Sequence, residues 1–213
     1  MQACASSVTK LARPRGRRAD GRTVVGVPRP PRLQVAGGLY HVTAHSNHGR
    51  VVFRDDQERS QFLAVLESAV RLFRWSCRSY CLLSTHYHLL VATPDPNLSA
   101  GMQHIGGRYA QWANWYREER SHIFEGRFRS ILVTSESHAL ELYRYIALNP
   151  VRAGLVRDPE EWRWSSLRAV LGREQPPGFL DVEAVLSEFG PNWATARRRL
   201  RRFVRDGLMM DAA

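Results

Sequence analysis

The sequence has only three cysteines, and none of them has the CxxC spacing of a zinc finger. If the segment around Cys77 and Cys81 is a strand, the two lie on one face about 13 Å apart, too far for a disulfide. No run of about 18 apolar residues is present, so we expect no transmembrane helix. The N-terminus also lacks an apolar stretch long enough for a secretory signal. These absences predict a protein of the reducing cytoplasm.

Lysine is almost absent, because Lys10 is the only lysine among 31 basic residues and the rest are arginine. The net charge of +11 is unevenly distributed. Residues 1–34 hold eight basic residues against one acidic residue, and residues 195–213 hold six arginines against two aspartates, whereas residues 35–194 are neutral. The planar guanidinium suits phosphates and stacks on bases, so this charge favours a nucleic-acid partner. The alternative is that basic tails only keep the chain in solution.

Composition and periodicity divide the chain into three parts. Residues 1–36 are rich in Pro, Arg and Gly and predict a flexible basic extension. Residues 37–157 have the alternating and helical patterns of a folded domain, and residues 158–213 predict a Trp-containing, Arg-rich helical extension. Two interpretations of residues 1–27 remain open: an arm that grips DNA, or a stretch upstream of the true start codon. We expect Trp162 and Trp164 to serve packing rather than base stacking.

The pattern within the folded domain predicts four strands and three helices. They are a strand from Gly38, a helix capped at Asp55–Asp56 that ends before Trp75, strands at 76–84 and 86–94, a helix at Leu98–Glu119, a strand at 128–134, and a helix capped by Ser137 that stops at Pro150. This order, β-α-β-β-α-β followed by a helix, predicts an α+β, ferredoxin-like antiparallel sheet with the first and third strands in its centre.

Two histidines and a tyrosine are the candidates for chemistry. His86 and His88 are two apart in a predicted strand, so both leave one face with Cα atoms about 7 Å apart and can converge on one metal ion. Tyr145 and Asn149 are at i and i+4 of the last predicted helix and therefore share a face. A tyrosine there could be a nucleophile and the asparagine oxygen a further ligand. The alternative is that these histidines are ordinary surface or core residues of a strand and that Tyr145 is a core aromatic.

Together these segments resemble the single-tyrosine HUH transposases, and most closely the REP-associated tyrosine transposases. The resemblance covers about residues 28–190 in one colinear order. The segments that carry it are GGLYHVTAHSN (37–47), CLLSTHYHLLV (81–91), FEGRFRSILV (124–133), YRYIALNPVRAGLV (143–156) and EWRWSSLRAVLG (161–172).

The resemblance implies a ferredoxin-like nuclease domain over residues 37–157 that cuts and rejoins single-stranded hairpin DNA of palindromic repeats. It places the nucleophile at Tyr145, which would form a 5′-phosphotyrosine. It places the metal ligands at His86, His88 and Asn149, with Mg²⁺ or Mn²⁺ as the cofactor. In the cell it implies a cytoplasmic, nucleoid-associated protein.

Arginines near the expected site are candidates for DNA binding. The alternative is that they are ordinary solvated arginines on an exposed edge of the domain. We expect Arg127, Arg129 and Arg152 to clamp phosphates. Tyr143 lies about 200° around the helix from Tyr145 and cannot point to the same site. His41 on the first strand is either near the metal site or a hydrogen-bonded core histidine.

Two other functions are compatible with parts of the pattern. A nucleic-acid-binding regulator could keep this fold without strand transfer, although the intact histidine pair and tyrosine argue against it. A metal-dependent phosphohydrolase that uses water would tolerate loss of Tyr145, whereas a strand transferase would not. Insertion-sequence relatives work as dimers and REP-associated ones act alone, so a homodimer stays open.

Overall fold

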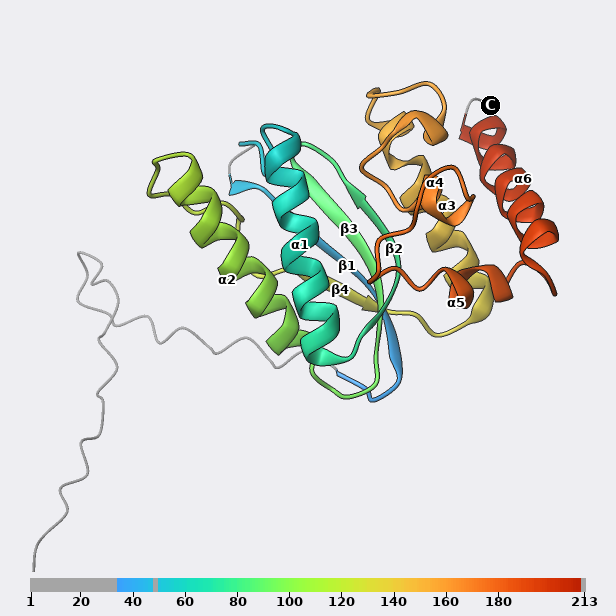
Figure 1. The fold of residues 1–213 in the computed structure, drawn as a ribbon, viewed down its shortest axis with the longest axis horizontal. Coiled ribbons are helices and arrows are strands. Elements are labelled where there is room, and N and C mark those ends of the chain that lie inside the picture. The colour runs from blue at the N-terminus through green and yellow to red at the C-terminus, as the bar shows by residue number, and fades with distance from the viewer. Residues whose placement is uncertain (1–33, 48–49, 212–213) are drawn as a thin grey trace, which may run out of the picture. The chain divides into compact units, whose positions relative to one another are not determined.

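The computed structural model describes residues 34–47 and 50–211 (Figure 1). The flexible extension expected for residues 1–36 lies mostly outside this range. None of the helices in the described ranges is both long and apolar enough to cross a membrane. In chain order the elements are β1 (Gly38–His45), α1 (Asp56–Phe73), β2 (Ser76–Leu82), β3 (His86–Thr93), α2 (Leu98–Tyr116), β4 (Arg129–Leu132), α3 (Glu136–Arg152), η2 (Pro159–Glu161), α4 (Leu167–Val170), α5 (Val182–Ser187) and α6 (Trp193–Asp211).

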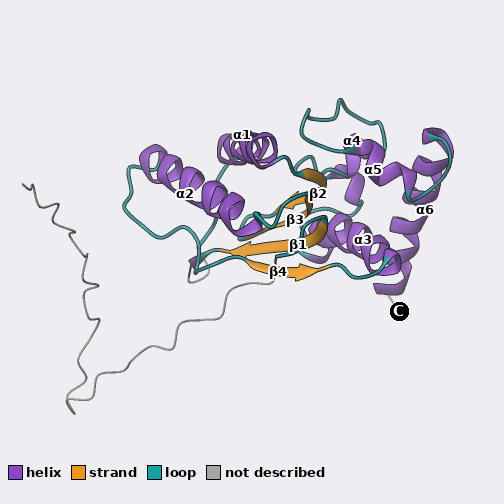
Figure 2. Cartoon of the chain, turned by 90° about the horizontal axis from the view of Figure 1, so that it is seen from below, coloured by secondary structure: helices purple, strands orange, loops and turns teal. Residues whose placement is uncertain are grey.

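The four strands form one antiparallel sheet in the order β2-β3-β1-β4. The first and third strands are therefore central, which confirms the predicted α+β, ferredoxin-like arrangement. Helices α1 and α2 lie side by side on one side of the sheet (Figure 2). Adjacent residues of a strand point to opposite faces, so Tyr87 packs on Phe62 of α1 with ring centroids 4.6 Å apart, while His88 points to the other face.

The start of α1 is fixed by the acidic cap that the sequence predicts. The Asp55 side chain accepts a hydrogen bond from the backbone N–H of Glu58 at 2.9 Å. Glu58 itself is fully buried and forms a bidentate ion pair with Arg117, which follows the end of α2, with two N–O distances of 2.6 Å. This buried pair joins the beginning of α1 to the end of α2.

The prediction that Cys77 and Cys81 share one face of a strand is wrong. The register of β2 against β3 shifts between Cys77 and Ser79, so Cys77 pairs with Val91 and Cys81 pairs with His88. Because these partners are three residues apart on β3, the two cysteines lie on opposite faces of the sheet. Both are buried free thiols, so the expectation that they form no disulfide with each other agrees with the structure.

Both ends of α3 differ from the prediction. Ser135, not Ser137, is the N-cap, and its hydroxyl accepts from the backbone N–H of His138 at 3.2 Å. The helix continues through Pro150: the proline lacks one backbone donor, but beyond it the N–H of Ala153 still donates to the carbonyl of Asn149 at 2.9 Å. It ends where Gly154 adopts a φ of 68° and donates to Val151, a left-handed terminus that favours glycine.

The C-terminal extension packs on the back of α3 and on β2. Trp162 donates its indole N–H to the carbonyl of Leu82 at 3.2 Å, and Trp164 donates to Asp56 at 2.9 Å, so both tryptophans serve packing. A Cβ at Gly207 of α6 would lie 2.6 Å from the side chain of Arg144 on α3, so a larger residue there would force Arg144 to move.

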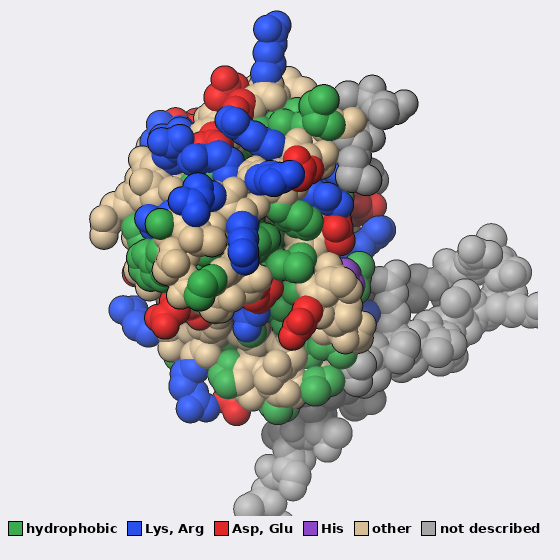
Figure 3. Space-filling view, turned by 90° about the vertical axis from the view of Figure 1, so that its right-hand side faces the viewer, with side chains coloured by type: hydrophobic (Ala, Val, Ile, Leu, Met, Phe, Trp, Pro, Cys, Tyr) green, Lys and Arg blue, Asp and Glu red, His purple; other side chains and the backbone are tan. Residues whose placement is uncertain are grey.

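Part of the positive charge of α6 is used inside the fold. Arg201 pairs with Glu160 at 2.9 Å, Arg205 with Asp158 at 3.3 Å, and Arg197 donates to a backbone carbonyl. Figure 3 shows basic side chains on this side of the molecule with acidic ones between them. The charge of this tail is therefore only partly available to an external partner.

Candidate active site

The two histidines of the HxH motif lie on β3 and point to the face of the sheet that α1 and α2 do not cover. Their ring centroids are 5.1 Å apart, with the planes nearly perpendicular. On the neighbouring strand β1, His45 lies opposite His86 and Thr43 lies opposite His88. The expected convergence of His86 and His88 is therefore present.

His88 is the more buried of the two, with 3% of its surface exposed. Its Nδ1 atom is hydrogen-bonded to Nε2 of His41 at 3.0 Å, and its own Nε2 is buried without a hydrogen-bond partner. Burial lowers the pKa of His88 to about 3, helped by the neighbouring His41, His86 and His45. The ring is therefore neutral near pH 7, and one nitrogen is free to accept a further partner.

His86 is half-buried and has a similar arrangement. Its Nδ1 lies 3.0 Å from the hydroxyl of Thr85, and its ring stacks on His45 with centroids 4.7 Å apart. Burial, followed by the proximity of His45, lowers the pKa of His86. Both imidazoles of the motif thus use Nδ1 in a local hydrogen bond, which leaves each Nε2 for another ligand.

Helix α3 places the side chain of Tyr145 against His88 and His41. Its ring centroid lies 5.4 Å from that of His88 and 5.8 Å from that of His41, edge to face in both cases. The side chain is 40% exposed, and the guanidinium carbon of Arg152 lies 5.2 Å from its ring centroid. A partly exposed tyrosine beside neutral imidazoles and one arginine can meet an incoming anionic group.

Tyr143 faces away from this cluster, as the helical spacing predicts. It is buried and donates a hydrogen bond to Glu188 at 3.2 Å. Burial, followed by the carboxylate of Glu188, raises the pKa of Tyr143. This tyrosine holds α3 against the C-terminal extension and is not accessible to a substrate.

Asn149 lies one turn after Tyr145 and is buried. Its side-chain N–H donates to the backbone carbonyl of Tyr145 at 2.8 Å. In the part of the chain that the structure describes, no three His, Cys, Asp or Glu side chains are grouped to hold a metal. The role of Asn149 as a third ligand, through its Oδ1, stays a prediction.

The three arginines expected near the site differ in position. Arg129 on β4 pairs with Thr43, which in turn pairs with His88, so Arg129 lies in the same cross-strand row and on the same face. Arg152 lies against Tyr145. Arg127 is exposed in the segment before β4. The structure thus brings Arg129 and Arg152 to the site, and DNA binding by all three stays a prediction.

Two histidines join the cluster beyond the motif. His41, for which the sequence left two roles open, contacts His88 and is buried, which lowers its pKa to about 4; the nearby His138 adds to this shift. His45 stacks on His86, and the sequence reasoning did not name it as a site residue. The signal was present, because residues 41, 43 and 45 share one face of an alternating strand.

Solved structures of two other proteins are similar to this chain. A REP-associated tyrosine transposase bound to a REP hairpin matches with a TM-score of 0.62 and 16% identity, over 78% of this chain and 93% of that chain. A candidate transposase from Deinococcus radiodurans matches with a TM-score of 0.40 and 14% identity, over 55% of this chain and 95% of that one. No protein-family model and no curated protein matches the sequence. The resemblance carried by the motifs is thus confirmed at the level of structure: this chain has the fold of the REP-associated tyrosine transposase.

Proposed function

We propose that the protein is a metal-dependent, single-tyrosine DNA endonuclease and strand transferase that acts on single-stranded hairpin DNA. One observation carries this proposal: the partly exposed ring of Tyr145 lies 5.4 Å from that of His88, beside the histidine pair of β3. The fold of a transposase bound to a REP hairpin supports the choice of hairpin DNA as the substrate.

The donor atoms fit a divalent ion, Mg²⁺ or Mn²⁺. His88 has a buried Nε2 without a partner, and neutral imidazole is the form that binds metals. In that state the Nδ1–H of His88 can donate to Nε2 of His41 and the Nδ1–H of His86 to the hydroxyl of Thr85, which is the support that metal-binding histidines usually have. We propose His86, His88 and Asn149 as the ligands. When bound, the ion would polarise a non-bridging oxygen of the scissile phosphate.

The side chains of this chain supply the other parts of the reaction. The phenolic oxygen of Tyr145 loses its proton as it attacks phosphorus, and the bond from phosphorus to the 3′ oxygen breaks. The 3′ oxygen takes up a proton and leaves as a 3′-hydroxyl, so one proton is released and one is consumed. Arg152 beside the ring and Arg129 on the same sheet face would balance the negative charge that develops. Because the link between Tyr145 and the 5′ end is itself a phosphodiester, another 3′-hydroxyl can attack it, release the tyrosine and join a new strand.

The test uses hairpin DNA labelled at one end or the other, incubated with Mn²⁺ and then denatured. A 5′-phosphotyrosine leaves the 3′ label on the protein and the 5′ label on a free fragment. Tyr145→Phe should abolish the adduct, whereas the matched variant Tyr143→Phe should keep it, because the buried Tyr143 hydroxyl bonds to Glu188 on the other side of α3. An adduct that survives in Tyr145→Phe would contradict the proposal, and DNA binding without any adduct would favour a regulator.

A further inference from the structure

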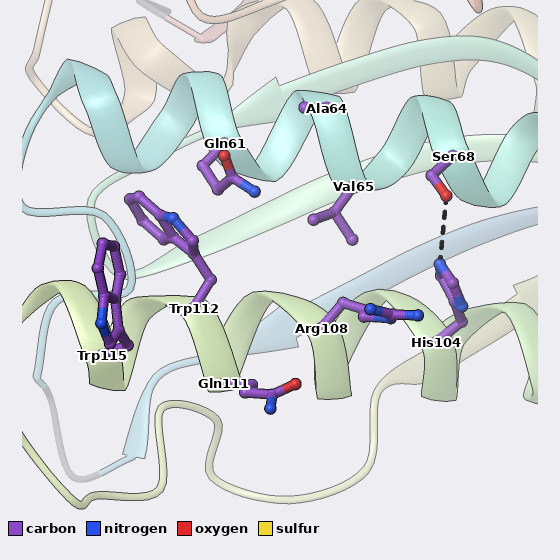
Figure 4. A pocket seen from close by; sticks show the side chains of 9 residues that line it. All are labelled: Gln61, Ala64, Val65, Ser68, His104, Arg108, Gln111, Trp112 and Trp115. Atoms are coloured by element: carbon purple, nitrogen blue, oxygen red, sulfur yellow. Dashed lines mark hydrogen bonds between the residues drawn. The ribbon is translucent and has the colours of Figure 1, made fainter.

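A groove of about 690 Å³ runs between α1 and α2 (Figure 4). It belongs to the sheet face opposite the candidate active site, because Tyr87 packs on Phe62 of α1 whereas its neighbour His88 packs on Tyr145 of α3. The groove is therefore separate from the chemistry proposed above, and the strand-transfer mechanism does not use its side chains.

One end of the groove carries two indole rings. Trp112 is half-buried and stacks on Tyr116 with ring centroids 4.8 Å apart and planes 11° from parallel. Trp115 is 74% exposed, and within the described ranges no aromatic ring or guanidinium lies against it. An indole left open beside a groove offers a flat apolar surface on which another ring can stack.

The remaining lining is mostly polar, with Ala64 and Val65 as the apolar residues, and it has no acidic side chain. Arg108 is exposed and, among the residues that the structure describes, has no ion pair or hydrogen bond from its guanidinium. In contrast, Arg117, which follows the same helix, is buried and forms an ion pair with Glu58. Gln61 from α1 and Gln111 from α2 contribute amides to the same groove.

The spacing along α2 suits an extended ligand. Arg108 and Trp115 are seven residues apart, so they lie on one face about 10 Å apart along the helix axis. His104, one turn before Arg108, lies at the other end of the groove. Its Nε2 is 3.5 Å from the hydroxyl of Ser68 (Figure 4). The lining thus offers a stacking surface, side-chain amides and a cation along the groove.

We propose that this groove binds a short single-stranded stretch of nucleic acid as a second, non-catalytic contact. A base stacks on Trp115, a backbone phosphate pairs with Arg108, and the two glutamines hydrogen-bond base edges. A protein partner could also use an exposed tryptophan, but an unpaired guanidinium in a lining without a carboxylate favours a polyanion. The inference rests on the proposed function only for the choice of DNA over RNA.

The test measures binding of fluorescein-labelled oligothymidylate, which forms no hairpin, by anisotropy over a salt series in EDTA. Trp115→Ala should weaken binding about 5-fold or more, and Trp115→Phe should restore part of the loss, because it keeps a ring. Arg108→Ala should lower the slope of log affinity against log salt by about 0.7. The matched controls are Trp193→Ala, an exposed indole on α6, and Arg157→Ala, which removes the same charge elsewhere.

The outcomes separate this proposal from the proposed function. If Trp115→Ala and Arg108→Ala bind oligothymidylate as tightly as the parent, or lose no more than their controls, the groove is not a nucleic-acid site. That result would overturn the inference even if the hairpin adduct still forms at Tyr145. If the parent forms no adduct but the groove variants lose binding as stated, the inference stands and the strand-transfer mechanism falls.

Discussion

His41 gives the most specific prediction about how the candidate metal site is built. Binding of a metal by Nε2 of His88 requires the proton on Nδ1, which can then donate only to Nε2 of His41, 3.0 Å away. Replacing His41 with Phe keeps a ring beside His88 and Tyr145 but removes the acceptor. The buried Nδ1–H of His88 is then left without a partner.

The size of the effect follows from that lost partner. An unsatisfied buried donor costs about 1–3 kcal/mol of folding free energy. Loss of a histidine's supporting hydrogen bond typically weakens metal binding about 10–100-fold. We therefore expect His41→Phe to stay folded, to unfold at lower urea concentration, and to bind Mn²⁺ at least about 10-fold more weakly than the parent.

Two assays and one control decide this prediction. Calorimetric titration with Mn²⁺ gives the affinity, and ¹⁵N NMR of the histidines in EDTA reports whether the His88 proton sits on Nδ1. His45→Phe is the matched control, because His45 is exposed and stacks on His86 rather than hydrogen-bonding to it. Unchanged Mn²⁺ affinity and an unchanged proton position in His41→Phe would refute the reasoning.

Three further predictions concern stability. His41 and His88 have pKa values of about 4 and about 3, below the value of about 6.5 in an unfolded chain, so the unfolded state takes up protons first as the pH falls. Urea unfolding in EDTA should therefore show a loss of about 2 kcal/mol per histidine between pH 7 and pH 5, and a flat profile would contradict the buried neutral pair. Glu58→Gln should cost about 3–5 kcal/mol because it leaves the guanidinium of Arg117 buried without its charge partner; a loss below 1 kcal/mol would show that the pair is hydrated. Gly107→Ala should stabilise α2 by about 0.5–1 kcal/mol, since a Cβ there meets no atom within 4 Å, and thermal unfolding would show a lower midpoint if that space is needed.

The element order and the motif positions could be predicted from the sequence because they depend on local spacing. Alternation fixed which residues of β3 share a face, and helical spacing separated Tyr143 from Tyr145. Features that depend on tertiary contacts could not be predicted from local spacing in the sequence. The shift in β2 that separates Cys77 from Cys81 is a property of strand pairing, and the end of α3 depends on Gly154 rather than on Pro150.

The same limit applies to charged and aromatic side chains. The arginines of residues 195–213 have the composition of a DNA-binding tail, but Arg201 and Arg205 meet acidic residues about 40 positions earlier in the chain. The hydrogen bond between His41 and His88 joins strands that are 47 residues apart. The exposure of Trp115 likewise follows from how α1 and α2 pack, which helical periodicity alone does not give.

The central claim is that Tyr145 becomes covalently joined to DNA. Its most direct test is mass-spectrometric mapping of the protein after reaction with hairpin DNA and Mn²⁺, followed by denaturation and digestion of both polymers. We expect one modified peptide, with a nucleotide attached through its 5′ phosphate to Tyr145. Attachment at Tyr143 or any other residue, or cleaved DNA with no modified peptide, would contradict the account.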